Sequence, residues 1–194
     1  DVENFPVIVW FHGGGLTGGD KGSSTARVAA ERFTNAGIGF VSANYRLSPR
    51  AEYPTYIEDA ADAIAWTYRN IAPRGGDPER LFVSGHSAGG YLAAIVAMDP
   101  AYLERSDLTP EALRGILPVS GQMDTHWTVK RERGISQDVQ VIDNAAPIQH
   151  AGEAPAPILL LCGDNDLPKR VEVNQQFLDA MNDAGETHIR LVVY

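Results

Sequence analysis

Disulfides, long apolar runs and an excess of positive charge are all missing from this sequence. It holds a single cysteine, Cys162 in an apolar run, so no disulfide can form within the chain. No apolar stretch approaches the roughly 20 residues that a helix needs to span a membrane. Lysine and arginine number 16 against 25 aspartates and glutamates, which gives a net charge of −9. This balance argues against a nucleic-acid-binding protein and against an anionic membrane surface as partner.

Signals of several other classes are also lacking. No stretch has the composition of an interdomain linker and no internal repeat is present, so residues 1–194 are expected to form a single domain. Clusters of His and Cys and an aspartate-rich calcium loop are absent, and no dinucleotide fingerprint follows the first apolar run. We therefore predict no metal and no other cofactor. The oligomeric state stays open. So does the compartment, with the cytoplasm favoured, because any signal peptide would lie upstream of Asp1.

Short apolar runs alternate with longer amphipathic segments along the chain. Strands are predicted at residues 7–15 (running into a glycine loop), 38–47, 80–86, 114–121, 156–164 and 187–194. Helices are predicted at 26–37, 56–71, 88–98 and 169–185, and one or two short helices within the irregular stretch 122–156. This alternation indicates an α/β fold with a mostly parallel sheet and helices on both faces. Ligands bind beyond the carboxyl ends of such strands, so the chemistry is expected in the loops that follow them.

One of these loops carries a serine in a motif that suits a nucleophile. The stretch "GHSAG" places Ser87 between Gly85 and Gly89, after the apolar "LFVS" and before the apolar "YLAAIVAM". A G-x-S-x-G sequence between a strand and a helix is typical of the nucleophile elbow, where small residues let strand and helix approach closely. The helix N-terminus then favours the negative charge that develops beside the serine oxygen.

A second loop, "HGGG" at residues 12–15, is rich in glycine and follows the first predicted strand. Acyl transfer needs donors aimed at the oxyanion, and glycines let backbone N–H groups point into a site unobstructed. We expect the amides of Gly14, Gly15 and Ala88 to form the oxyanion hole. A phosphate-binding P-loop is excluded, because Asp20 rather than lysine follows Gly19.

The motifs "HGGGL", "NYRLSP", "DPERLFVSGHSAGGYLAA" and "LLLCGDNDLP" together resemble α/β-hydrolases of the carboxylesterase type. The resemblance covers nearly the whole chain and lies near the hormone-sensitive-lipase and kynurenine-formamidase-like branches. It implies the α/β-hydrolase fold, here without its first strands and without the segment after its last strand. It also implies a serine hydrolase that cleaves small-molecule carboxylic esters through an acyl-enzyme on Ser87. An amidase or formamidase with the same machinery, or a catalytically inert binding protein of this fold, remains the alternative.

The resemblance places the acid of a catalytic triad in the loop after "ILLLC", where two aspartates stand. The family pattern of a glycine, then an aspartate, then a proline fits Gly163, Asp166 and Pro168, so Asp166 is expected. Asp164 is then a loop or capping carboxylate. Asp124, in the loop after the fourth predicted strand, is a further alternative.

None of the five histidines fits the base of such a triad. His12 belongs to the glycine loop by its position in the sequence. The side chain of His86 is expected to point away from that of Ser87. His126 and His150 precede Asp166, against the chain order serine, acid, histidine. His188 opens a strand and so lies at the wrong end of the sheet. We therefore hypothesise that the catalytic histidine lies beyond Tyr194.

The irregular stretch 122–156 is the internal candidate for a lid. Its residues Met123, His126, Trp127 and Val129 are candidates to line an acyl pocket. For Trp127, packing in the core beneath the loop is an equal alternative.

Overall fold

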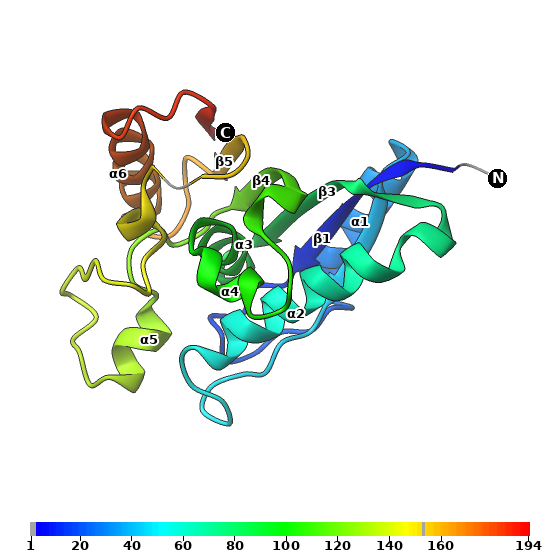
Figure 1. Ribbon diagram of the computed structural model, residues 1–194. Coiled ribbons are helices and arrows are strands. Elements are labelled where there is room, and N and C mark those ends of the chain that lie inside the picture. Colours follow the sequence, from blue (N-terminus) through cyan, green and yellow to red (C-terminus); the bar gives the residue numbers. More distant parts are fainter. Residues whose placement is uncertain (1–2, 153) are drawn as a thin grey trace.

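The computed structural model describes residues 3–152 and 154–194 and has a six-stranded sheet at its centre (Figure 1). All strand pairs are parallel, in the order β2-β1-β3-β4-β5-β6. The strands are β1 (Phe5–Phe11), β2 (Gly39–Ala43), β3 (Gly76–His86), β4 (Leu113–Val119), β5 (Ile158–Cys162) and β6 (Ile189–Val193). The six predicted strands are confirmed, although β2 ends four residues earlier and β3 begins four residues earlier than the apolar runs indicated.

The helices are α1 (Ser24–Asn35), α2 (Thr55–Asn70), α3 (Ala88–Met98), α4 (Pro100–Glu104), α5 (Trp127–Glu132) and α6 (Arg170–Asp183). The four long helices confirm the prediction, and α5 is one of the short helices expected within 122–156. The sequence did not predict α4, because five residues are too few to show helical periodicity. None of the helices in the described part of the chain is long and apolar enough to cross a membrane.

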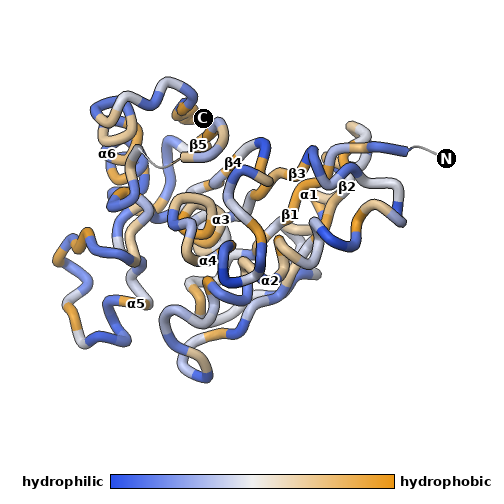
Figure 2. Tube along the Cα trace, in the orientation of Figure 1, coloured by the Kyte–Doolittle hydropathy of each residue, from blue (hydrophilic) through white to orange (hydrophobic). Residues whose placement is uncertain are grey.

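Helix α3 is the centre of the hydrophobic core. All eleven of its residues are buried, because it packs against β1, β3 and β4 on one side and against α2 and α4 on the other. A helix that is apolar on every side, as "AGGYLAAIVAM" is, must lie inside a protein. Figure 2 shows apolar residues gathered along α3 and the strands beside it.

The opposite face of the sheet is covered at one end by α1. Phe33 of α1 stacks on Phe40 of β2 at 6.0 Å between ring centroids, and Phe40 in turn contacts Trp10 of β1. Over β3 to β6 this face carries half-buried side chains, among them Phe82 and Leu117, which line a shallow hollow. The sheet thus has helices on both faces, as predicted, with the heavier layer on the side of α3.

Parallel pairing brings the carboxyl ends of the strands to one edge. Phe11 of β1 is paired with Gly85 of β3, and His86 of β3 with Val119 of β4. The glycine loop after β1, the serine after β3 and the loops after β4 and β5 therefore begin side by side.

Close contact between α3 and the strand ends requires glycine at position 89. A Cβ at Gly89 would overlap the carbonyl group of Phe11, and one at Gly85 would overlap the backbone of Gly89. Strand β3 and helix α3 thus meet with no room for a side chain between them.

Replacing Gly89 by alanine tests this contact. We expect Gly89→Ala to lower the free energy of unfolding by about 1 to 3 kcal/mol, because overpacking outweighs the gain in helix propensity. Urea unfolding followed by circular dichroism measures the change. Gly18→Ala is the matched control, since a Cβ at Gly18 meets no atom within 4 Å. Equal stability of the two variants would contradict the tight contact.

Candidate active site

Ser87 occupies the sharp turn between β3 and α3. Its φ of 55° and ψ of −114° lie in a region that side-chain-bearing residues rarely adopt, which is typical of a nucleophile elbow. The Ser87 amide donates to the carbonyl of Val119 at 2.8 Å, and the Ser87 carbonyl accepts the first helical bond, from Tyr91, at 3.0 Å. These two bonds hold the strained turn and leave Ser87 half-buried at the edge where the loops meet.

The glycine loop after β1 lies against this turn. A Cβ at Gly13 would stand 3.4 Å from the Cβ of Ser87, so the loop and the serine are neighbours. Gly14 and Gly15 adopt φ values of 122° and 63°, which only glycine takes without strain. Within the described residues, the amide N–H groups of Gly14, Gly15 and Ala88 donate no hydrogen bond.

His12 and Tyr45 hold the start of the glycine loop. Their rings stack at 4.4 Å between centroids, and the buried Tyr45 hydroxyl donates to the His12 carbonyl at 2.8 Å. A Cβ at Gly19 would overlap the His12 ring, so the loop folds back over this histidine. His12 lies in the glycine loop, as the sequence predicted. The sequence did not predict that Tyr45 supports this loop, because nothing in "NYRL" indicates a contact with His12.

Helix α5 closes the outer side of the glycine loop. The Thr128 hydroxyl donates to the carbonyl of Gly15. The Trp127 ring lies where a Cβ of Gly15 would be, so residue 15 must be glycine for α5 to pack there. The loop stretch 122–156 is therefore joined directly to the candidate oxyanion loop.

Asp166 follows β5 at the same edge. Its Oδ1 accepts the Leu167 amide at 2.7 Å, whereas its buried Oδ2 has no hydrogen-bond partner in the described part of the chain. Burial raises the pKa of this carboxyl, but the Ser120 hydroxyl and nearby backbone amides outweigh burial, and the charge of Arg170 adds to them. The pKa of Asp166 is thus lowered, and the group is ionised at neutral pH.

The other two candidate acids sit in different surroundings. Asp164 is exposed, accepts a hydrogen bond from the Asn165 side chain and contacts Tyr194 only through its own amide. Asp124 is buried and accepts a hydrogen bond from the Gln122 amide group at 2.8 Å. Burial raises the pKa of Asp124. Among the three, Asp166 is the one that has a buried oxygen without a hydrogen-bond partner in the described residues.

No histidine forms a hydrogen bond with Ser87 in residues 3–152 and 154–194. His86 is half-buried close to Asp166, and burial lowers its pKa. His126 is buried, and its Nδ1 accepts the Thr128 amide at 3.2 Å, so it caps the start of α5. His150 bonds the carbonyl of Asn144. His188 is exposed just before β6, at the amino end of the sheet.

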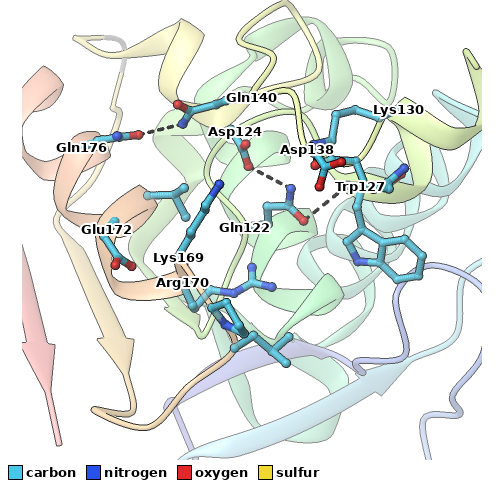
Figure 3. A pocket seen from close by; sticks show the side chains of 14 residues that line it. Gln122, Asp124, Trp127, Lys130, Asp138, Gln140, Lys169, Arg170, Glu172 and Gln176 are labelled. Carbon is cyan, nitrogen blue, oxygen red and sulfur yellow. Dashed lines mark hydrogen bonds between the residues drawn. The ribbon is translucent and has the colours of Figure 1, made fainter. Parts of the chain in front are cut away.

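A pocket of about 660 Å³ opens beside Asp166, between the 122–140 stretch and the start of α6 (Figure 3). Trp127 lines it, whereas Met123 and His126 do not. Both are buried in the interior, with Met123 in the core beneath the loop and His126 between the rings of Tyr91 and Trp127. Val129 also belongs to the buried core. Of the four expected pocket residues, Trp127 therefore lines the wall, whereas Met123, His126 and Val129 are buried behind it.

Polar and charged residues that the sequence did not suggest supply much of this wall. They include Gln122, Lys130 and Arg170. Lys130 is buried and donates to the carbonyls of Gln137 at 3.2 Å and Val139 at 2.9 Å, which holds the loop together. No group of three or more His, Cys, Asp or Glu in the described residues is arranged to hold a metal ion.

The chain is similar in sequence to curated esterases. Esterase LipQ of Mycobacterium tuberculosis is 31% identical over 198 residues, which cover 93% of this chain and 46% of the relative. Carboxylesterase NlhH of the same species is 43% identical over 97 residues, which cover 49% of this chain and 30% of the relative. The chain thus spans half or less of the length of these curated relatives.

Solved structures of esterases share the fold over the full chain. The apo form of Thermogutta terrifontis esterase 2 has a TM-score of 0.82 at 25% identity and covers 100% of this chain and 73% of its own. The esterase of Pyrobaculum calidifontis has a TM-score of 0.78 at 26% identity, with coverages of 100% and 68%. The family model described as alpha/beta hydrolase fold matches residues 8–161. Together with the parallel sheet and the turn at Ser87, this match establishes that the chain belongs to the α/β hydrolase fold family.

Proposed function

We propose that the protein of which this chain is part is a carboxylesterase that hydrolyses small-molecule esters through an acyl-enzyme on Ser87. The observation that carries the proposal is the strained turn at Ser87, held beside a glycine loop at the N-terminus of a wholly buried helix. Similarity to proteins named as esterases supports the reaction class. The amidase and inert-binder alternatives find no separate support in the geometry.

In the proposed mechanism the Ser87 hydroxyl attacks the ester carbonyl. The amides of Gly14, Gly15 and Ala88 receive the oxyanion of the tetrahedral intermediate. Their lack of other acceptors supports this role, because a free N–H group costs no existing hydrogen bond when it binds the oxyanion. Collapse of the intermediate expels the alcohol, and water then releases the acid from Ser87.

Asp166 is the proposed acid that orients the base. An ionised carboxylate with one buried, unpartnered oxygen is suited to accept the N–H of an imidazole and to stabilise the imidazolium that forms. The five histidines present are placed elsewhere. We propose that a histidine after Tyr194 serves Ser87, because β6 ends beside this loop, with the Asp164 amide donating to the Tyr194 carbonyl.

Replacing the nucleophile tests the mechanism. In the full-length protein, Ser87→Ala is expected to lower kcat for 4-nitrophenyl acetate at least about 10³-fold, because no acyl-enzyme can form. Labelling by a fluorophosphonate probe should disappear with it. Ser24→Ala, an exposed serine on α1, is the control and should retain activity and labelling. Hydrolysis that persists in Ser87→Ala would contradict the assignment of Ser87 as the nucleophile.

The two aspartates of the loop after β5 provide a second test. Asp166→Asn is expected to lower kcat about 10³- to 10⁴-fold, because an amide cannot stabilise the imidazolium. Asp164→Asn should change kcat less than about fivefold, since an exposed carboxylate interacts weakly with a site in high dielectric. Steady-state kinetics on the same ester measures both. A larger loss of kcat in Asp164→Asn than in Asp166→Asn would identify Asp164 as the acid instead.

A further inference from the structure

Arg170, the first residue of α6, is a buried cation that no carboxylate contacts directly, although the charges of Asp166 and Asp124 act on it. The residue is 7% exposed, and within the described residues its side chain forms no ion pair and donates no hydrogen bond. Its Nη1 is fully buried without an acceptor. Burial of a charge that lacks hydrogen-bonded partners is costly, so a guanidinium in this state calls for a ligand or a functional role.

The guanidinium points into the pocket beside Asp166. Figure 3 shows it extending from the start of α6 beneath Gln122. Two other buried charged groups of the wall are already engaged: Lys130 donates to two carbonyls, and Asp124 accepts from Gln122. Lys169 also lines the wall but is exposed, so Arg170 is the buried cation of this wall that is left to bind a ligand.

This pocket adjoins the proposed catalytic residues on two sides. Its wall from Leu167 to Arg170 continues directly from Asp166, and Trp127 on the other side packs against Gly15. The charge of Arg170 also acts on His86, the residue before Ser87. Ser87 itself does not line the pocket, so a substrate whose carbonyl lies at Ser87 has to extend past Trp127 or Asp166 to reach Arg170.

The chemistry of the wall favours a singly charged, planar anion. A guanidinium presents parallel N–H groups that match the two oxygens of a carboxylate. The N-terminus of α6 has no side-chain cap, so its partial positive charge adds to that of Arg170. Asp124, Asp138 and Glu172 also line the pocket, and their charges disfavour a doubly charged phosphate more strongly than a singly charged carboxylate.

We propose that Arg170 binds a carboxylate of the substrate, so that the enzyme prefers esters whose acyl or alcohol part carries a carboxylate group. This inference rests on the proposed function and specifies its substrate class. Arg170 is then a specificity-determining residue: it contacts a remote group of the substrate, while Ser87 and the oxyanion amides perform the chemistry.

Matched pairs of esters test the inference in the full-length protein. One pair is 4-nitrophenyl hydrogen glutarate and 4-nitrophenyl pentanoate, with the carboxylate on the acyl side. The other is 3-acetoxybenzoate and phenyl acetate, with the carboxylate on the alcohol side. We expect a higher kcat/KM for the charged ester in at least one pair. Arg170→Met should lower that charged-to-neutral ratio at least about tenfold, as expected for loss of a charge-assisted hydrogen bond.

Two further variants separate a direct contact from a general charge effect. Arg170→Lys should restore part of the ratio, because it keeps the charge but not the two-pronged geometry. Lys169→Met removes the neighbouring exposed charge and should change the ratio less than about threefold. Circular dichroism and thermal unfolding check that each variant folds. An unchanged ratio in Arg170→Met for both pairs, or an equal loss in Lys169→Met, overturns the proposal.

A direct binding measurement distinguishes this inference from the proposed function. If the protein hydrolyses none of these esters, the proposed function fails. Calorimetric titration with glutarate and with benzoate then decides whether the carboxylate site exists. Binding of either acid to the wild type but not to Arg170→Met supports it, and equal binding or no binding overturns it.

Discussion

The contact between the start of α3 and the ends of β1 and β3 is the constraint on which the rest of the site depends. Gly89 lies so close to the Phe11 carbonyl that no side chain fits between helix and strand. This approach forces the chain through the turn at Ser87, whose amide is bonded to Val119. It also brings the glycine loop after β1 next to the serine. Backbone packing in the core therefore positions the Ser87 hydroxyl, and side chains around it contribute less.

Energetically unfavourable features gather at the same edge of the sheet. Ser87 has a strained backbone, one oxygen of Asp166 lacks a hydrogen-bond partner, and the buried guanidinium of Arg170 is in direct contact with no anion in the described residues. Each would be costly in an ordinary core, where polar groups are paired and backbones relaxed. The wholly apolar α3 and the parallel strands around it offset these costs. Such a distribution is expected of a site that is preorganised for binding and charge stabilisation.

Much of the fold was predictable, because it depends on local patterns. The apolar runs located every strand, and the pattern of α3, apolar on all sides, indicated a buried helix behind Ser87. Contacts between distant segments could not be read in the same way. The stacking of Tyr45 on His12 joins residues 33 positions apart, and α4 is too short to show periodicity. Met123 and His126 illustrate the same difficulty, since apolar or aromatic character alone does not separate a pocket wall from the core beneath it.

The sequence by itself determined the α/β class, the nucleophile motif at Ser87 and the glycine loop, because strand periodicity and glycine spacing act over a few neighbouring residues. Only the tertiary structure distinguished Asp166 from Asp164 and Asp124 by burial and hydrogen bonding. It also showed that no histidine of the described residues is hydrogen-bonded to Ser87, and it revealed Arg170 as a buried cation. Burial, pairing and charge environment arise from segments far apart in the chain, so no local pattern carries them.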